Sequence, residues 1–382
     1  MEEREYQRCT CCVLDTSDEK IEFDANGKCN RCNEYESRIL PDWNHGKGHE
    51  AELQNLVNAI RTSGKGKKYD CLIGLSGGLD SSFLLHKAVK EWGLHPYVLH
   101  IDAGWDLPVA TENIKKVTDG LGVELHVQTM DWNEMKELQL AWFRTGLYNL
   151  DAPQDHAFIA QVDRYAQKVG VKYILNGYNI QTEVIADPSS WGKGTGGPTG
   201  DAVFMKDVIR KYCRIPIRKY TFTNGFKHKF FLPFVLGVKT VTPLNLVPFT
   251  RQEMIDTLVR EYGYTPYGQK HFEDLLTKFL EGWWVPTRFG HDIRIAQLSS
   301  LVITGELPRE EALEILAKPP VTEEEAKAMF KEVSAKLGIT EAELRHYHEM
   351  PMSTERFRTT RAIRKAAIRV YEKLGLEKRI RK

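Results

Sequence analysis

The chain has 382 residues, of which 42% are hydrophobic and 27% are charged, and its formal net charge is +1 at pH 7. This length predicts two or three structural units with a substantial core, and no apolar run is long enough to span a membrane. The nearly balanced charge does not favour nucleic acid as a partner. The chain begins with an acidic, polar segment and without a signal peptide, so we expect a cytoplasmic protein.

Two cysteine pairs lie near the N-terminus. Each pair has two intervening residues, and sixteen residues separate the pairs, which are Cys9 with Cys12 and Cys29 with Cys32. This spacing favours a zinc ribbon in which four thiolates hold a structural Zn²⁺, because four protein ligands leave no open coordination position. The Asn26-Gly27 dipeptide before the second pair is typical of a hairpin turn.

The cysteine pattern leaves three alternatives open. Cys11 lies beside Cys12 and could replace it as a ligand, although only Cys12 gives the two-residue gap. An iron–sulfur cluster uses the same kind of ligand set. Disulfides would also pair these cysteines, but a reducing compartment disfavours them.

Strand and helix patterns alternate through the middle of the chain. Strands are expected at residues 69–75, 95–101, 123–129, 171–176 and 241–246, and helices at residues 81–92, 108–121, 133–146, 155–169 and 201–212. Such alternation predicts an α/β fold with a doubly wound parallel sheet, in which ligands bind beyond the carboxyl ends of the strands.

A glycine-rich loop, Gly-Leu-Ser-Gly-Gly-Leu-Asp-Ser-Ser at residues 74–82, joins the first expected strand to the first expected helix. Backbone N–H groups at such a turn form an anion site, and glycine lets the backbone approach a ligand closely. We expect phosphate to be bound by Ser76, Gly77, Gly78, Asp80 and Ser81, with Asp80 also holding Mg²⁺. The lysine of the kinase-type phosphate loop is absent. A turn that only closes a βα unit is the alternative.

Two further loops are expected at the same edge of the sheet, at residues 102–105 and 176–183. Asp102 directly follows the second strand, where it could meet a nucleoside, and Gly177 follows the fourth strand. Asp102 could equally be an ordinary turn or helix-cap aspartate.

Two segments have an unusual composition. Residues 188–200 contain five glycines and two prolines, which favours a long loop, either a lid or a segment without function. Residues 355–382 contain eleven Lys or Arg against three Glu. This tail is either a solvated basic helix face or a docking surface.

From residue 250 onward the pattern is helical, and Thr250 with Glu253 is a capping box at a helix start. Between this helix and the next lies a polar, aromatic stretch, from which Lys278 and Arg288 could reach the β- and γ-phosphates as catalytic cations. The alternative is a surface helix with ion pairs. We therefore expect three units: a zinc ribbon at 1–45, an α/β domain at 46–249 and a helical region at 250–382.

The pattern Ser-Gly-Gly-Leu-Asp-Ser resembles the pyrophosphate loop of the ATP pyrophosphatase superfamily, whose members split ATP into AMP and pyrophosphate. Together with the ribbon, the later motifs resemble those of the N-acetyl sugar amidotransferases over a range from Cys9 to about Leu316. These motifs are Lys270-His271-x-Glu273, Thr277-Lys278-Phe279, Phe289-Gly290-x-Asp292-x-Arg294, Leu298-Ser299-Ser300-Leu301-Val302 and Arg309-x-Glu311-Ala312-Leu313. Gln297 departs from the family pattern, which has His there, so we expect no proton transfer at that position.

The resemblance implies an ATP-dependent enzyme of lipopolysaccharide or other surface-glycan biosynthesis, with ATP, Mg²⁺ and Zn²⁺ as cofactors. Its acceptor would be an acetamido group on a nucleotide-activated sugar, either a UDP-diacetamido hexose or a CMP-nonulosonate. Adenylation of the amide oxygen would make AMP the leaving group, and ammonia would replace it to give an acetamidino group. A tRNA-modifying enzyme of the thiolation type and a non-catalytic nucleotide-binding scaffold are the alternatives.

The cysteine inventory bears on the source of ammonia. Neither Cys71 nor Cys213 lies in a glycine-flanked nucleophile elbow, and the second residue is Glu2 and not the cysteine of an N-terminal glutaminase. We therefore expect ammonia to come from a separate glutaminase subunit or from free ammonium.

Overall fold

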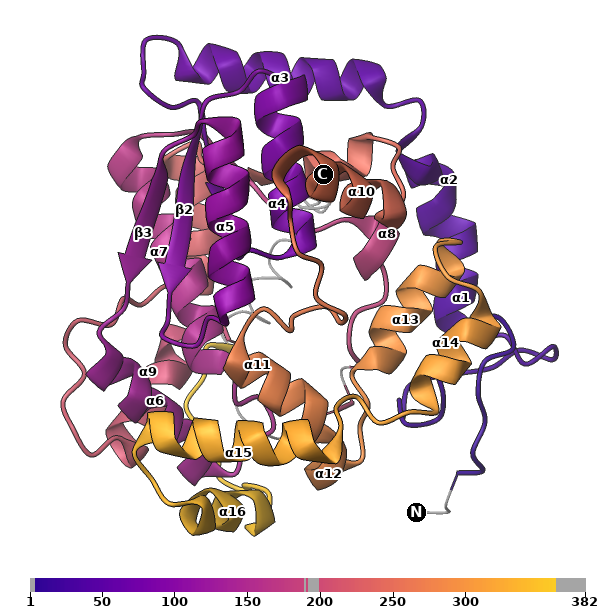
Figure 1. The fold of residues 1–382 in the computed structure, drawn as a ribbon, viewed down its shortest axis with the longest axis vertical. Helices are drawn as coiled ribbons and strands as arrows, with labels where there is room; N and C mark the ends of the chain where they lie inside the picture. Colours follow the sequence, from indigo (N-terminus) through magenta and orange to yellow (C-terminus); the bar gives the residue numbers. More distant parts are fainter. Residues whose placement is uncertain (1–3, 189, 192–198, 362–382) are drawn as a thin grey trace.

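A computed structural model describes residues 4–188, 190–191 and 199–361 of the chain (Figure 1). Its sheet has five strands in the order β3-β2-β1-β4-β5, and every neighbouring pair is parallel. The strands are β1 Cys71–Gly74, β2 Pro96–Asp102, β3 Leu125–Thr129, β4 Tyr173–Leu175 and β5 Lys239–Val241. The chain runs outward from β1 to β3 and then returns to the other side of β1, so the order reverses between β1 and β4.

Helices cover both faces of this sheet, because the strand residues that point to either face are apolar. Leu72 and Leu99 pack into one core cluster, whereas Ile73 and Val98 pack into another. The second cluster is closed by α3 Glu50–Gly64, α4 Leu79–His86, α5 Pro108–Leu121 and α10 Arg251–Tyr262. The first is closed by α6 Trp132–Thr145, α7 Ala152–Val169, α9 Ala202–Tyr212, α11 Leu275–Phe279, α15 Glu323–Leu337 and α16 Glu341–Glu349. The expected doubly wound α/β fold is confirmed.

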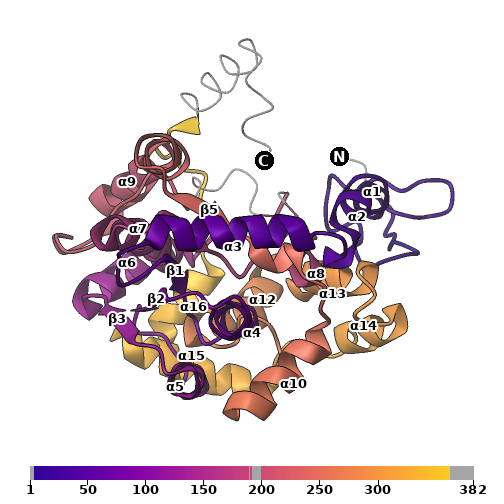
Figure 2. The same ribbon diagram turned by 90° about the horizontal axis from the view of Figure 1, so that it is seen from above.

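Shorter elements complete the described chain. The N-terminal part contains α1 Asn30–Glu34, η1 Tyr35–Ile39, α2 Leu40–Trp43 and η2 Asn44–Gly46. The remaining elements are η3 Lys87–Glu91, α8 Ile180–Glu183, η4 Lys227–Val235, η5 Pro243–Leu246, η6 Leu280–Trp284, α12 Val285–Phe289, α13 Arg294–Ile303 and α14 Arg309–Leu316. Figures 1 and 2 show α1 and α2 beside α13 and α14, so the N-terminal segment lies against a part of the chain almost three hundred residues later.

Most expected elements are present with ends shifted by a few residues, but the expected strand at 241–246 is wrong beyond its first residue. β5 ends at Val241, and Pro243–Leu246 forms a 3₁₀ turn. Pro243 has no N–H group to donate to a sheet ladder, which explains the early end. The expected capping box of Thr250 and Glu253 is confirmed.

Two sequence-based expectations fall largely outside the described residues. The glycine-rich segment is described only at its edges, where Trp191 donates from Nε1 to the carbonyl of Ser17 over 3.0 Å. The basic tail is described only as far as Arg361. Among the described helices, none is long and apolar enough to cross a membrane.

Candidate functional site

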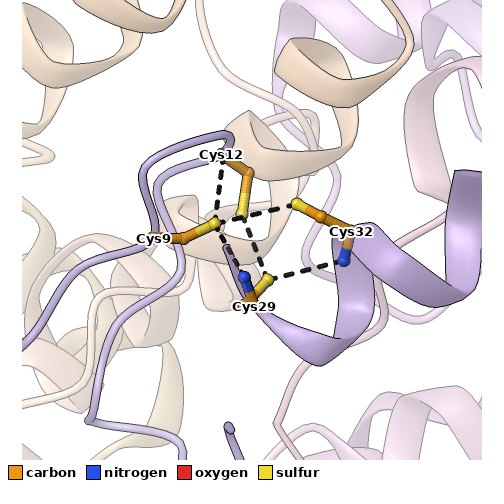
Figure 3. Close-up of side chains that lie close together, drawn as sticks. All are labelled: Cys9, Cys12, Cys29 and Cys32. Atoms are coloured by element: carbon orange, nitrogen blue, oxygen red, sulfur yellow. Dashed lines mark hydrogen bonds between the residues drawn. The ribbon is translucent and has the colours of Figure 1, made fainter. Parts of the chain in front are cut away.

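Four cysteine sulfurs converge at the N-terminus (Figure 3). The Sγ atoms of Cys9 and Cys32 lie 3.8 Å apart, and those of Cys12 and Cys29 lie 3.7 Å apart. A tetrahedral Zn²⁺ with Zn–S bonds of about 2.3 Å requires S–S separations of about 3.8 Å. All four residues are buried, whereas Cys11 is not part of the cluster. The geometry therefore fits zinc held by Cys12 and not by Cys11.

The backbone supports this cysteine cluster. N–H groups of Cys12 and Cys29 donate to Sγ of Cys9 over 3.4 and 3.2 Å, as expected where a thiolate carries negative charge. Arg309 of α14 donates to the carbonyls of Cys12 and Cys9 over 3.0 and 2.7 Å. The cluster is thus fixed to the C-terminal region.

The glycine-rich loop leaves β1 and enters α4 without a side-chain cap. Two of its three serines face each other, with the Oγ atoms of Ser76 and Ser81 3.2 Å apart, and Ser76 Oγ accepts the Gly78 N–H over 3.1 Å. The first N–H groups of a helix have no intrahelical acceptor, so the start of α4 offers donors to an anion.

Close contacts explain the three predicted glycines. Gly77 has φ +85°, and a Cβ there would lie 2.6 Å from the Ala110 carbonyl oxygen. A Cβ on Gly78 would lie 2.9 Å from Oε1 of Glu273. A Cβ on Gly177, in the loop after β4, would lie 3.2 Å from the Ser81 nitrogen. The loops after β1 and β4 therefore touch at the point where the strand order reverses.

Asp80 is held by groups from two other segments. Asn179 Nδ2 donates to Asp80 Oδ1 over 2.7 Å, and Lys270 Nζ donates to Asp80 Oδ2 over 2.9 Å. Lys270 also pairs with Glu183 over 2.6 Å. Burial lowers the pKa of Lys270, but Asp80 and Glu183 outweigh it and raise the pKa above its ordinary value. Lys270 is thus a cation fixed at the loop.

The other predicted residues are divided by the tertiary structure. Lys278 lines the same cavity as Asp80 and pairs with Glu325 over 3.2 Å. Arg288 is not brought to the cavity: it donates to the carbonyls of Tyr347, His348 and Met350 at the end of α16. Its sequence position close to Lys278 was misleading because the helix turns it toward the opposite side. We therefore do not retain Arg288 as a catalytic residue.

Asp102 also lies outside the cavity. Its carboxylate accepts the Gly104 N–H over 2.8 Å, as an ordinary turn aspartate does. Asp102 lines neither of the two cavities described below. The expected meeting of three loops is thus a meeting of two, after β1 and β4.

A cavity of about 880 Å³ opens over these two loops. Five Lys or Arg residues line it, and they are Arg251, Lys270, Lys278, Arg294 and Lys318. The same wall contains Ser76, Gly78, Asp80, Ser81 and Gly177. We call it the loop cavity. Its cations, hydroxyls and backbone donors suit a polyphosphate.

A second cavity of about 660 Å³ lies beyond the ends of β1 and β2, and we call it the acidic cavity. Seven carboxylates line it: Asp106, Asp151, Asp155, Asp187, Glu273, Asp274 and Glu281. Among the described residues no Lys or Arg lines it. The two cavities share Ser76, His271 and Glu273 in their walls, so they adjoin there.

His271 is the cation at this junction. Burial disfavours its charge, but Glu281, whose Oε1 lies 3.2 Å from Nδ1, outweighs burial and raises the pKa of His271 to about 9. Its φ of +67° is unusual for a residue with a side chain. Burial raises the pKa of Asp155, Asp187 and Asp274 each to about 6. The acidic cavity thus holds carboxylates that are costly to ionise.

Sequence reasoning missed Lys270 as a site residue, and it also missed Asn179 and the acidic cavity. Lys270 belongs to the Lys270-His271-x-Glu273 motif, and this motif is the one sequence feature that could have identified it as a site residue. Asn179 carries no motif, and its role depends on β4 lying beside β1. The seven carboxylates come from segments between residues 106 and 281, so no local pattern reveals them.

Removal of one cysteine ligand gives a direct test of the metal centre. We expect one zinc per chain, and we expect Cys12→Ser to lose it and to loosen the N-terminal 45 residues, because metal binding and folding are coupled in small ribbons. Cys11→Ser is the matched control and should keep the metal. Elemental analysis and hydrogen exchange measure both effects. An iron–sulfur absorption spectrum, or equal metal loss in both variants, would contradict the assignment.

The pKa of Asp155 gives a pH-dependent prediction. In the folded state the pKa is about 6, against an ordinary 3.8, so the folded protein binds this proton more tightly than the unfolded chain. The ionised Asp155 carboxylate therefore lowers the free energy of unfolding above about pH 6, and this loss of stability is relieved as the pH falls through that value. Asp155→Asn should be more stable than wild type at pH 7.5, by an amount that shrinks toward pH 5. Urea unfolding at several pH values measures this difference. Glu332→Gln, at an exposed position of α15, is the control and should change stability equally little at each pH. A stability difference for Asp155→Asn that does not vary with pH would contradict the raised pKa.

Part of the C-terminal region is similar to a known protein family. Residues 273–374 match a family model described as "LPS biosynthesis protein WbpG-like, C-terminal domain". An uncharacterized protein of Methanocaldococcus jannaschii is 23% identical over 323 residues, which are 83% of this chain and 95% of that protein.

Two solved structures are also similar. An NMN synthetase from Francisella tularensis is 15% identical, with a TM-score of 0.29, covering 58% of this chain and 98% of that one. An NH3-dependent NAD synthetase from Campylobacter jejuni is 11% identical, with a TM-score of 0.28, covering 80% and 99%. Over its C-terminal region the chain matches the WbpG-like lipopolysaccharide-biosynthesis proteins, which confirms the resemblance drawn from its motifs.

Proposed function

We propose that this protein is an ATP-dependent amidotransferase of lipopolysaccharide or surface-glycan biosynthesis. It adenylates an acetamido group of a nucleotide-activated sugar and replaces the amide oxygen with ammonia. The observation that carries the proposal is the loop cavity: an anion-binding turn at the sheet's reversal point, fixed through Asp80 and Lys270, beside the WbpG-like region.

The loop residues suit ATP and Mg²⁺. Ser76, Gly78 and Ser81 would contact the phosphates, and Gly77 and Gly177 allow the close backbone approach that such contacts need. Asp80 would hold Mg²⁺, which supplies positive charge to the departing pyrophosphate. Lys270 would add its charge on the same side, and Lys278, which lines the same cavity, would reach the outer phosphates.

The chemistry follows from the weak reactivity of an amide. The acetamido oxygen attacks the α-phosphorus of ATP, and pyrophosphate leaves. Ammonia then attacks the activated carbon, and AMP leaves with the former amide oxygen, which gives the acetamidino group. The junction of the two cavities, near Ser76 and Glu273, is where the acetamido group would meet the α-phosphate, because it adjoins the loop while offering polar side chains.

The cysteines support an external source of ammonia. Cys71 is fully buried in β1, and burial raises the pKa of its thiol well above the ordinary value. Burial, together with the smaller effect of the Glu137 charge, raises the pKa of Cys213 to about 12. A thiol with a raised pKa is a poor nucleophile at neutral pH. We therefore propose a separate glutaminase subunit, or free ammonium, as the source.

Substitution at the loop tests the adenylation step. Asp80→Asn and Lys270→Met should each lower pyrophosphate release from ATP and an acetamido sugar by at least about a hundredfold, since each removes charge stabilisation from the transition state. The matched control is Arg288→Met, which removes a cation from the same sequence region but away from the cavity, and which should change stability more than rate. If the activity of Asp80→Asn stays within tenfold of wild type, Asp80 does not hold the metal and its assignment to the site is wrong.

A second experiment tests the ammonia source. The isolated chain should form AMP with sugar acceptor and ammonium salts and should be inert with glutamine. Addition of the partner glutaminase should restore glutamine use. If the lone chain uses glutamine, and Cys71→Ser or Cys213→Ser loses that use while keeping ammonium-dependent activity, the glutaminase site lies in this chain and the partner proposal fails.

A further inference from the structure

The acidic cavity has a charge that the proposed adenylation does not explain. Of its seven carboxylates, Asp106 pairs with His100 over 2.9 Å and Glu281 pairs with His271. His100 lies between Asp106 and the Leu75 carbonyl, and burial lowers its pKa, but Asp106 outweighs burial and raises the pKa, which favours the imidazolium form. Two imidazolium groups therefore balance two carboxylates and leave five without a cation among the described residues.

The remaining carboxylates line one cavity, where Asp151, Asp155, Glu273 and Asp274 are partly buried and Asp187 is exposed. Asp151 and Asp155 lie one turn apart on or beside the first turn of α7, and Asp155 adds to the effect of burial in raising the pKa of Asp151. Asp187 and Asp274 face the same space from other segments. Burial raises the pKa of all four carboxyl groups. A cluster of this kind gains stability when a cation enters it.

A second observation points to a ligand with N–H donors. Gln154 is only 2% exposed and lines the acidic cavity, and its Nε2 donates to Thr277 over 3.0 Å. Its Oε1 is buried, and among the described residues it accepts no hydrogen bond. A buried acceptor without a donor is unfavourable, so it is normally matched by a ligand or water. The unmatched oxygen and the carboxylates are all acceptors.

The spread of the carboxylates argues against a divalent metal. In the described part of the chain, the four cysteines are the one group of three or more His, Cys, Asp or Glu residues whose ligand atoms all lie within 4.8 Å of one another. A Ca²⁺ or Mg²⁺ ion needs oxygen ligands gathered more tightly than this cavity offers. Ammonium holds its acceptors about 2.9 Å from its nitrogen, farther than the roughly 2.3–2.6 Å of a Ca²⁺ ligand, so it fits a wider site of fewer oxygens.

We propose that the acidic cavity is an ammonium-binding site that feeds the junction of the two cavities. Asp151, Asp155 and Gln154 Oε1 accept N–H groups of the ion, and Asp187 and Asp274 complete its negative surroundings. This inference rests on the proposed function for the fate of the ion, although binding itself does not depend on it.

The location suits the later step. Neutral ammonia is the nucleophile, so the bound ion must lose one proton: an N–H bond breaks, an O–H bond forms on a carboxylate of the cavity, and the nitrogen keeps the electron pair. Asp155, with a pKa of about 6, is a stronger base than an ordinary aspartate. His271 and Glu273 line both cavities, so ammonia released here adjoins the place where the acetamido carbon would be activated.

The first test measures binding without turnover. Titration of the full chain with isotope-labelled ammonium chloride, at constant ionic strength, should show saturable line broadening of the ammonium nitrogen signal. Asp151→Asn and Asp155→Asn, either of which can replace the other if one fails to fold, should each weaken binding about tenfold, the effect of about 1.4 kcal/mol. The control is Glu332→Gln, at an exposed position of α15, which should leave ammonium binding unchanged. Potassium should compete weakly, and tetramethylammonium, which has no N–H group, should not compete.

The second test measures kinetics. Asp151→Asn should raise the KM for ammonium about tenfold and leave kcat at saturating ammonium within threefold of wild type. Asp155→Asn should raise this KM similarly and should also lower kcat, because it removes the carboxylate that takes the proton. Both variants should leave ATP–pyrophosphate exchange with the acetamido sugar unchanged. Unchanged ammonium binding and KM in both variants would overturn the site, as would equal affinity for potassium and ammonium. If wild type binds ammonium in this way but no acetamido sugar supports exchange, the site stands and the proposed function fails.

Discussion

The adjacency of β1 and β4 is the constraint on which the site depends. Because the strand order reverses there, the loops after these strands leave toward opposite faces and open a crevice between them. Gly177 can then touch the chain at Ser81, and Asn179 can reach Asp80 over 2.7 Å. Lys270 closes the crevice from the C-terminal region. A single topological feature thus gathers groups that are about a hundred to two hundred residues apart in the sequence.

The two cavities differ in charge, and one short segment forms the border: the loop cavity has five Lys or Arg and five carboxylates in its wall, whereas the acidic cavity has seven carboxylates and, among the described residues, no Lys or Arg. Lys270 lines the loop cavity, Asp274 lines the acidic cavity, and His271 and Glu273 line both. The positive φ of His271 reverses the chain locally, which lets neighbouring residues face different cavities. Such a conformation costs free energy and persists where the surroundings hold it, here through the His271–Glu281 ion pair.

The cysteine cluster contributes to the site through the helices that it supports. Arg309 donates to two carbonyls of the cluster, and Ser299 Oγ accepts the Val13 N–H over 3.3 Å. These residues belong to α14 and α13, whose other side chains, including Arg294 and Gln297, line the loop cavity. The cysteine cluster at the N-terminus thus contacts one wall of a cavity formed mainly by residues more than two hundred positions away.

The sequence by itself determined the features that depend on local spacing. The cysteine pairs, the glycine-rich loop between strand and helix, and the Thr250 capping box each need only a few consecutive residues, and all are present as expected. The alternation of strands and helices likewise predicted the doubly wound sheet, because apolar periodicity reflects burial on two faces.

Only the tertiary structure decided which cations and carboxylates act together. Lys278 and Arg288 were equivalent in the sequence, yet the helix that follows η6 directs Arg288 to the end of α16 and leaves Lys278 in the cavity. Lys270 gained its place from a contact with Asp80, 190 residues earlier. The acidic cavity is assembled from distant segments, and its properties come from burial. Burial and long-range pairing are set by packing of the whole chain, so no local pattern carries them.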